Sequence, residues 1–222
     1  MTEGQYSPLQ PRASMVIKLF VEHGIRSWSD RTLLHLDEED SVPMFDRQLL
    51  KEVDLSKGVS RLHECGLSIN NPGDNLVLRP LCSGDYEKGF VSLLSQLTKV
   101  GDVTKEMFLK RFHAMKSCPS TYYIIVVEDT KLEKIVGTGT LILEQKFIHE
   151  IAVRGRIEDI VVDNTCRGKK IGKLIVETLM LLSEKLECYK TSLECKDPLL
   201  TFYTQFGLKR EDNQNYVCKR FF

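Results

Sequence analysis

The sequence lacks a charge imbalance and long apolar runs. It carries 31 Lys and Arg against 31 Asp and Glu, so its formal net charge is zero, and no overall field draws it to nucleic acid or to an anionic membrane. The apolar stretch at residues 15–21 is too short to cross a membrane and contains Lys18. A signal of the charged-then-apolar kind is also missing from residues 1–13. We therefore expect no nucleic-acid partner and no transmembrane segment, and an anionic ligand must be held by local cations and backbone amides.

Cysteines with metal-binding spacing are missing as well. The seven cysteines are an odd number, and none stands in a CxxC or Cys/His arrangement that suits zinc. Unpatterned cysteines of this kind indicate free thiols and a reducing environment. We therefore expect no metal site and a cytoplasmic location.

Composition divides the chain into three expected regions. Residues 1–43 are mixed in composition, with prolines and the acidic run 37–40, and predict a flexible N-terminal extension; a targeting or partner-binding segment is the alternative. Met44 could serve as a second start. Residues 44–75 predict a short helix and then a linker rich in Gly, Ser, Asn and Pro. Residues 76–222 are long enough for one folded domain.

Residues 76–222 predict an α/β (α+β) domain with a mixed, mostly antiparallel, twisted sheet flanked by helices. Its one parallel connection lies after residue 157, where a strand, a long amphipathic helix and another strand form a crossover unit. Asp85 and Thr104 are good N-caps for two helices. The expected elements are strand 76–81, helices 85–97 and 104–115, strands 122–127, 135–143 and 157–162, a helix to about 187, strand 191–195, helix 198–206, and strands 208–210 and 216–221.

The turn after the expected strand 157–162 has the composition of an anion site. It reads DNTCRGKKIGK over residues 163–173 and leads into a helix, whose N-terminus presents free amides and a positive dipole end. Gly168 and Gly172 let ligand oxygens approach the backbone, and four cations lie among residues 167–173. A solvated basic helix start is the alternative, but cations in a first turn oppose helix stability. The turn therefore favours phosphate.

The stretch RGKKIG resembles the acyl-CoA turn of the GNAT superfamily of N-acetyltransferases, written Q/R-x-x-G-x-G/A. Arg167 and Gly172 match the ends of that motif, and Lys170 stands at the usual central glycine. A wider resemblance, over residues 77–221, is to the glucosamine 6-phosphate N-acetyltransferases, the sugar-phosphate branch. The stretches that carry it are LTKVG (97–101), EQKFIHE (144–150), GRIEDIVV (155–162), RGKKIGK (167–173), CYKTSLEC (188–195) and FYTQFG (202–207), with MFDRQLLKEVD (44–54) resembling the start of animal members.

This resemblance implies the GNAT acyl-CoA N-acyltransferase fold and acetyl transfer from acetyl-CoA to the amine of glucosamine 6-phosphate, in UDP-N-acetylglucosamine biosynthesis. It also implies a homodimer with the last strand near the partner. Leu199 replaces an asparagine that contacts the CoA arm in the family. The acetyl-CoA contacts that the resemblance implies are Ile160, Val161, Val162, Arg167, Gly168, Lys169, Lys170, Ile171, Gly172, Lys173 and Tyr203.

Four residues match catalytic positions of the family. Tyr203 matches the general acid, with a core aromatic as the alternative. A tyrosine of pKa about 10 protonates a thiolate of pKa about 8.5 at a cost of roughly 2 kcal/mol, so we expect a hydrogen bond to the leaving sulfur. Glu158 and Asp159 should point to opposite faces of their strand, and either could bind sugar hydroxyls or take the amine proton. Glu194 matches the acid that orients the amine.

The resemblance also implies a set of polar and basic contacts to the sugar phosphate, because a phosphate dianion needs several converging cations. Lys219 stands where many members have arginine, and lysine lacks the bidentate fork. The implied substrate contacts are Thr98, Lys146, Phe147, Ile148, His149, Glu158, Asp159, Tyr189, Lys190, Lys219 and Arg220.

Two other functions stay open from the sequence. An acetyltransferase of this fold could act on a protein amine or another small amine, although the lysine and histidine residues favour an anionic acceptor. The third hypothesis is a domain that binds acyl-CoA without catalysis. The presence of Tyr203, Glu158, Asp159 and Glu194 argues against it.

Overall fold

The computed structural model describes residues 41–221. The extension expected at residues 1–43, with its alternatives, therefore lies almost wholly outside the described residues. The chain from Ser41 onward forms a unit of its own.

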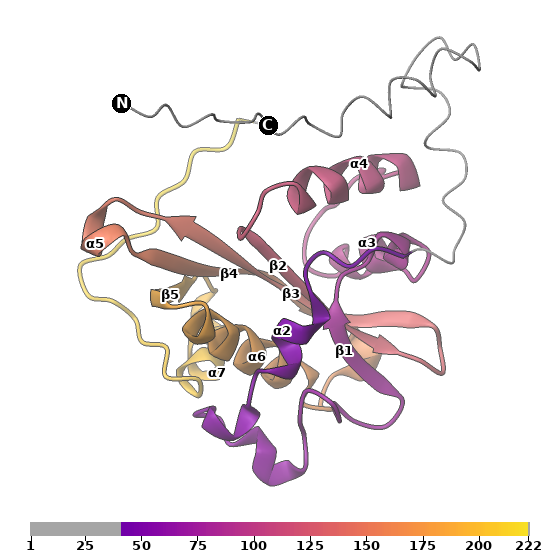
Figure 1. The fold of residues 1–222 in the computed structure, drawn as a ribbon, viewed down its shortest axis with the longest axis horizontal. Helices are drawn as coiled ribbons and strands as arrows, with labels where there is room; N and C mark the ends of the chain where they lie inside the picture. The colour runs from indigo at the N-terminus through magenta and orange to yellow at the C-terminus, as the bar shows by residue number, and fades with distance from the viewer. Residues whose placement is uncertain (1–40, 222) are drawn as a thin grey trace, which may run out of the picture. The chain divides into compact units, whose positions relative to one another are not determined.

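A five-stranded sheet runs through this unit (Figure 1). The strands lie in sequence order, antiparallel from β1 to β4 and parallel between β4 and β5. The helix α6 (Ile171–Lys185) connects β4 to β5. The mixed, mostly antiparallel sheet and its parallel connection are therefore confirmed. The strands are β1 (Leu76–Pro80), β2 (Tyr122–Asp129), β3 (Lys134–Gln145), β4 (Val153–Val162) and β5 (Cys188–Leu193).

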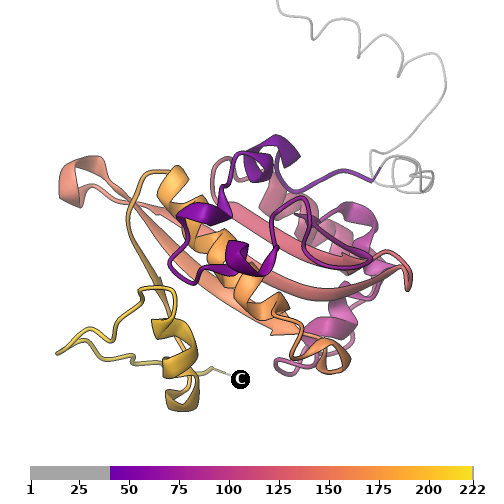
Figure 2. The same cartoon turned by 90° about the horizontal axis from the view of Figure 1, so that it is seen from below.

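Helices cover both faces of the sheet (Figure 2). The larger core cluster joins α6 and the N-terminal segment to one face, and a second cluster joins α3 and α4 to the other. The remaining α-helices are α2 (Arg47–Lys51), α3 (Phe90–Leu94), α4 (Lys105–Lys116), α5 (Ile148–Ile151) and α7 (Leu200–Thr204). The 3₁₀ turns are η2 (Leu55–Lys57), η3 (Leu62–Cys65), η4 (Ser83–Tyr86), η5 (Asn164–Cys166) and η6 (Asp197–Leu199).

These two layers explain the unbroken apolar run of β2. Ile125 and Val127 belong to the cluster beneath α6, whereas Ile124 and Val126 belong to the cluster beneath α3 and α4. All four side chains are at most 5% exposed. A strand covered on both faces needs apolar residues at every position rather than at every second one.

Two glycines of β3 let α6 approach the sheet closely. A Cβ on Gly137 would lie 2.8 Å from Ile171, and one on Gly139 would lie 2.6 Å from Ile175. Both separations are shorter than side-chain carbons tolerate. The N-terminal turns of α6 are thus held directly against the sheet, which fixes the position of the anion-binding turn.

Asp85 does not cap the helix that we expected to begin there. Its carboxylate accepts hydrogen bonds from Arg79 at 2.8 and 2.7 Å and from the N–H of Cys82 at 2.7 Å. Arg79 also pairs with Glu128, and all three charged groups are buried. The helix predicted over 85–97 is reduced to α3, because Asp85 belongs to this buried ion cluster.

The second helix was predicted correctly. Thr104 accepts a hydrogen bond from the N–H of Met107 at 3.2 Å, and α4 follows it. Residues 55–75, which we expected to be a linker, instead contribute Leu55, Leu62 and Ile69 to the larger core cluster.

The strands predicted at 208–210 and 216–221 were wrong for the part of the chain that the structure describes. The helix α7 is capped by Gln205, and Gly207, with a φ of +79°, follows two residues later. Beyond it the chain runs outside the sheet (Figure 1). Tyr216, Val217 and Phe221 are 67%, 85% and 80% exposed. A strand needs a neighbouring edge to pair with, and this segment meets none within residues 41–221.

Candidate active site

The β4–β5 pair opens toward the carboxyl end of β4. Parallel pairing runs from Val153 and Cys188 to Ile157 and Leu193 and then stops, although β4 continues to Val162. Within residues 41–221, the stretch 158–162 therefore has no strand neighbour on the β5 side. Backbone groups along such an edge are available to another hydrogen-bonding partner, so the opening can accept an extended ligand.

A β-bulge lies in this unpaired part of β4. Between Glu158 and Val161, β4 has two residues where β3 has one. Asp159 has a φ of +54°, a conformation that residues other than glycine adopt at some cost. As a result Ile160 packs with the α6–α7 cluster and Val161 with the α3–α4 cluster. The strand alternation on which the expectation for Glu158 and Asp159 was based is thus interrupted beyond Glu158, because a bulge changes which face the following residues meet.

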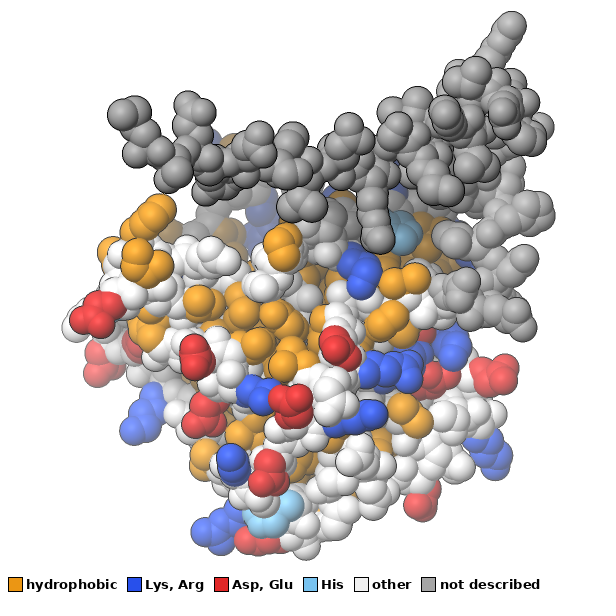
Figure 3. All heavy atoms as spheres, in the orientation of Figure 1, with side chains coloured by type: hydrophobic (Ala, Val, Ile, Leu, Met, Phe, Trp, Pro, Cys, Tyr) orange, Lys and Arg blue, Asp and Glu red, His pale blue; other side chains and the backbone are white. Residues whose placement is uncertain are grey.

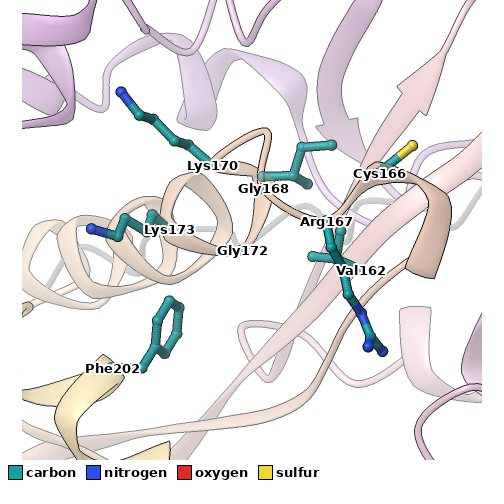
Figure 4. Close-up of a pocket in the computed structure, with 9 residues that line it drawn as sticks. Val162, Cys166, Arg167, Gly168, Lys170, Gly172, Lys173 and Phe202 are labelled. Atoms are coloured by element: carbon teal, nitrogen blue, oxygen red, sulfur yellow. The ribbon is translucent and has the colours of Figure 1, made fainter.

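The turn before α6 shows why the family motif has glycine where this chain has Lys170. Gly168 and Lys170 have φ values of +84° and +63°, so the motif position of Lys170 requires the left-handed conformation that glycine adopts freely. A lysine pays about 1 kcal/mol for it. Its Nζ lies 2.9 Å from Sγ of Cys65, and Figure 4 shows the side chain directed away from Phe202.

A pocket of about 310 Å³ lies at the N-terminus of α6 (Figure 4). A Cβ on Gly172 would lie 3.6 Å from Val162 and 3.8 Å from Phe202. Glycine is thus needed not for the fold but to keep this space open. Lys169 lies in the turn without lining the pocket. The pocket is lined by Val162, Cys166, Arg167, Gly168, Lys170, Ile171, Gly172, Lys173 and Phe202.

Sequence reasoning missed Phe202 as a pocket residue. The available signal was its place beside Tyr203 in the stretch FYTQFG. Its ring centroid lies 5.1 Å from that of Tyr203, so the pocket at the turn and the expected general acid are in direct contact. Leu199, in η6, is 46% exposed and does not line the pocket.

Tyr203 combines a packed ring with an available hydroxyl. The residue is 8% exposed and clusters with Val176 of α6 and with Ile160 of the bulge. Burial raises the pKa of its hydroxyl, and Cys195 adds to the effect, so the hydroxyl stays protonated at neutral pH. It makes no hydrogen bond within the described residues. Tyr203 is thus a core aromatic whose hydroxyl can donate to a ligand.

Arg156 joins two of the expected catalytic acids. It contacts Glu158 and lies 2.9 Å from Glu194. Sequence reasoning missed this arginine and Arg154, although Arg154, Arg156 and Glu158 occupy alternate positions of one strand and so share a face. The ion pairs hold Glu158 and Glu194 in place, which suits them to positioning a substrate rather than to removing a proton.

Unlike Glu158 and Glu194, Asp159 has no ion-pair or hydrogen-bond partner for its carboxylate within the described residues. Although solvent reaches its side chain, the surrounding protein partly desolvates the carboxylate. This desolvation and repulsion from Glu158 raise the pKa of Asp159. An unpaired carboxylate with a raised pKa is better suited to accept a proton than one held by an arginine.

Basic side chains gather at the other end of β4. Lys146 and Arg154 lie 2.6 and 3.7 Å from the carboxylate of Glu144. Lys190, which pairs with Arg154 in the β4–β5 register, lies 3.5 Å from Glu211. The two lysines expected to bind phosphate therefore lie at the same end of the sheet, and both have carboxylate partners in this chain.

The α5 end of the molecule is apolar and exposed. Phe147, Ile148 and Ile151 are 96%, 64% and 72% exposed, and Figure 3 shows hydrophobic side chains gathered there, while charges of both signs are scattered over the rest of the visible face. The ring of His149 lies 4.6 Å from that of Tyr189. Exposed apolar groups of this size indicate an interaction surface.

The expected phosphate ligands lie far from the bulge within one chain. From Asp159 back to Val153, β4 spans about 20 Å, and Lys190 and His149 lie at the Val153 end. A hexosamine phosphate is shorter than this separation. The backbone positions of Lys190 and Asp159, five residues apart along β4 by the β4–β5 register, are thus about 17 Å apart, and only side chains extended toward each other could share one small acceptor.

The other expected acceptor residues are spread further. Thr98 lies two residues after Gln96, whose side chain contacts Asp163 just beyond β4. Lys219 and Arg220 lie on the extended C-terminal segment, where Lys219 lies 5.3 Å from the ring centre of Phe221. The expected cofactor contacts at Val162, Arg167, Gly168 and residues 170–173 thus line one pocket, whereas Lys169 does not line it and Val161 packs in the α3–α4 cluster. The expected acceptor contacts are spread over several stretches of the chain.

Comparison with known proteins identifies the family. The sequence model of the Acetyltransferase (GNAT) family matches residues 90–208. A Drosophila melanogaster protein named probable glucosamine 6-phosphate N-acetyltransferase is 47% identical over 165 residues, 74% of this chain and 74% of that protein. The chain belongs to the glucosamine 6-phosphate N-acetyltransferase family of the GNAT acetyltransferases.

Further relatives agree with this family. Glucosamine 6-phosphate N-acetyltransferase 1 of Dictyostelium discoideum is 40% identical, over 64% of this chain and 89% of that protein. The crystal structure of the Arabidopsis thaliana glucosamine-6-phosphate N-acetyltransferase superposes with a TM-score of 0.64 at 38% identity, covering 67% of this chain and 99% of that one. The predicted GNAT fold and family are therefore confirmed.

The sequence also led us to expect no metal site and no transmembrane segment. Between residues 41 and 221, no group of three or more His, Cys, Asp or Glu is placed to hold a metal ion. In the same range, every helix is too short or too polar to cross a membrane.

Proposed function

We propose that this protein transfers the acetyl group of acetyl-CoA to the amine of glucosamine 6-phosphate, for UDP-N-acetylglucosamine biosynthesis. The observation that carries this proposal is that the pocket for the cofactor and the expected general acid, Tyr203, lie in contact at one opening of the sheet. Phe202 lines the pocket at the α6 N-terminus, and its ring contacts Tyr203. The relatives of this family are named for the same reaction.

The proposed position of acetyl-CoA follows from the pocket and the open strand edge. The pyrophosphate would lie on the turn at Arg167–Gly172, where helix amides and the cations Arg167 and Lys173 favour an anion. The acyl arm would extend along residues 158–162, whose backbone groups have no strand neighbour on the β5 side. A backbone N–H there would polarise the thioester carbonyl, which is worth about 3 kcal/mol to the transition state.

We assign each side chain near the opening a separate role in the reaction. The neutral amine attacks the carbonyl carbon, the C–N bond forms and the C–S bond breaks. Asp159 is proposed to take the proton that the amine loses, because its carboxylate is unpaired and its pKa is raised. Tyr203 donates a hydrogen bond to the leaving sulfur without giving up its proton, since its own pKa is raised. Arg156 holds Glu194 and Glu158 beside the acceptor.

We also propose a homodimer in which a second copy completes the acceptor site. Two observations support it. Within one chain, the backbone positions of Lys190 and Asp159 lie about 17 Å apart along β4, which disfavours a shared acceptor. In addition, Phe147 and Ile148 beside β4 and the C-terminal residues after Gly207 are exposed and outside the sheet. A cytoplasmic location is part of the proposal, supported by seven free cysteines.

The decisive assay measures thiol release from acetyl-CoA with three acceptors in parallel. We expect turnover with glucosamine 6-phosphate, much slower turnover with unphosphorylated glucosamine, and none with a peptide amine. The difference between the first two acceptors reports the phosphate site. Turnover with the peptide alone would replace this proposal by a protein acetyltransferase, and tight CoA binding without turnover would replace it by a binding module.

A further inference from the structure

Gln96 connects two segments that the proposed reaction assigns to different substrates. It follows α3 and precedes residues 97–101, the acceptor loop, which holds Thr98. Its Nε2 donates to Oδ2 of Asp163 at 3.3 Å, and its Oε1 accepts from the N–H of Asn164 at 3.0 Å. Among the described residues, these are the side-chain hydrogen bonds that join the end of α3 to residues 163–172, the CoA turn. A carboxamide can make both because it donates and accepts at once.

Asp163 is a rigid anchor for the start of the CoA turn. It is 1% exposed, and its carboxylate accepts from Lys134 at 2.7 Å and from the Thr165 hydroxyl at 2.7 Å. These hydrogen bonds hold the pKa of Asp163 far below its usual range. The N–H of Thr165 bonds the same carboxylate, and the N–H of Cys166 bonds the Asp163 carbonyl. The Gln96 amide thus attaches the acceptor loop to the fixed base of the turn.

We propose that Gln96 is a positioning residue that couples the acceptor loop to the CoA turn, so that acetyl-CoA binding orders the loop for the amine. This inference rests on the proposed function. The loop is exposed, with Leu97 at 45%, and has freedom to lose when a substrate binds. A ligand in the pocket, which Val162 and Cys166 line on either side of Asp163 and Asn164, would suppress local opening of this segment and, through Gln96, of the loop, so the amine then binds at a lower entropic cost. Because coupling is reciprocal, the amine tightens CoA binding by the same factor.

Hydrogen exchange tests the coupling without any acceptor. We expect CoA to slow amide exchange at residues 97–101 in the wild type. In Gln96→Met, which keeps the length of the side chain but not its hydrogen bonds, CoA should still bind and protect the turn while the loop exchanges as in the free protein. Gln48→Met, an exposed change on α2, is the matched control and should behave as the wild type. Equal loop protection in the wild type and Gln96→Met, or no protection in the CoA-bound wild type, would overturn the inference.

Kinetics give a second, independent readout. The loss of one hydrogen bond to the Asp163 carboxylate and one to the Asn164 N–H predicts a KM for the amine about tenfold higher in Gln96→Met, with CoA affinity measured without amine nearly unchanged. Gln96→Glu keeps an acceptor for Asn164 but places a carboxylate against Asp163, and should lose the coupling too. A lower melting temperature with normal coupling in either variant would assign Gln96 a merely structural role. If the wild type fails to acetylate glucosamine 6-phosphate, the proposed function fails, and the exchange result still decides the role of Gln96.

Discussion

The cofactor side and the acceptor side of this site are built differently. The pocket lining comes from residues 162–173 and one neighbour, Phe202. The expected acceptor contacts come from five separate stretches between Thr98 and Arg220, and the length of β4 keeps some of them about 20 Å from Asp159. A site within one turn depends on local geometry that a short motif specifies. A site assembled from distant stretches depends on the fold and, in our proposal, on a second copy.

Filling the pocket should break the cofactor side alone. In Gly172→Val, the new side chain would occupy the space beside Val162 and Phe202, where a Cβ meets only ordinary contacts. We expect the KM for acetyl-CoA to rise on the order of a hundredfold through lost phosphate contacts, with little change in thermal stability. Steady-state kinetics and calorimetry with CoA measure the effect. Normal CoA affinity in this variant would move the pyrophosphate elsewhere.

Removing the Tyr203 hydroxyl should slow the reaction itself, because Tyr203 lies where the cofactor side and the acceptor side meet. Tyr203→Phe keeps the packed ring and loses one hydrogen bond to the leaving sulfur, so kcat should fall about tenfold or more with unchanged CoA binding. Tyr122→Phe, at the start of β2, is the matched control. An unchanged kcat in Tyr203→Phe would remove this residue from the mechanism.

On the acceptor side, the pH dependence of kcat tests whether Asp159 is the base. Asp159 must be ionised to take a proton, so kcat at saturating substrates should fall as pH drops through its pKa, which lies above the usual value for aspartate. Glu158→Gln removes the repelling carboxylate and should move this acid limb to lower pH. Asp159→Asn should abolish the limb and lower kcat. If Asp159→Asn showed the same fall in kcat at low pH as the wild type, Asp159 would be excluded as the base.

The smallest expected effect concerns Lys170. Lys170→Gly relieves the left-handed backbone strain, offset in part by the freedom of glycine in the unfolded chain, and should stabilise the fold by about 0.5 kcal/mol in urea unfolding. CoA affinity should change little, because the Lys170 ammonium lies against Cys65. A large loss of affinity would show that this lysine turns to bind the pyrophosphate.

The fold was predictable wherever periodicity and caps were decisive. The hairpin of β2 and β3, the cap at Thr104 and the crossover through α6 all follow from local patterns, and the structure confirms them. Asp85 was misassigned because a good capping residue is also a good ion-pair partner, and Arg79 lies on a different element. The strands expected after Gly207 failed because apolar alternation does not supply a neighbouring edge.

The site was predictable to the extent that it is local. The turn at Arg167–Gly172 could be predicted from composition, and the left-handed φ of Lys170 shows why the motif usually has glycine there. The bulge at Asp159 could not, since it depends on pairing with β3. Arg156 was missed because its role depends on two carboxylates from different strands meeting on one face.

The most direct test of the division between the two sides is complementation between two defective chains. Gly172→Val should disable the cofactor side, and the double variant Lys146→Ala with Lys190→Ala should disable the acceptor side, so each protein alone should be nearly inactive. Co-expressed in equal amounts, they should form mixed dimers with one intact site, which restores about a quarter of wild-type activity. A mixture no more active than its separate components would contradict an acceptor site completed by a second copy.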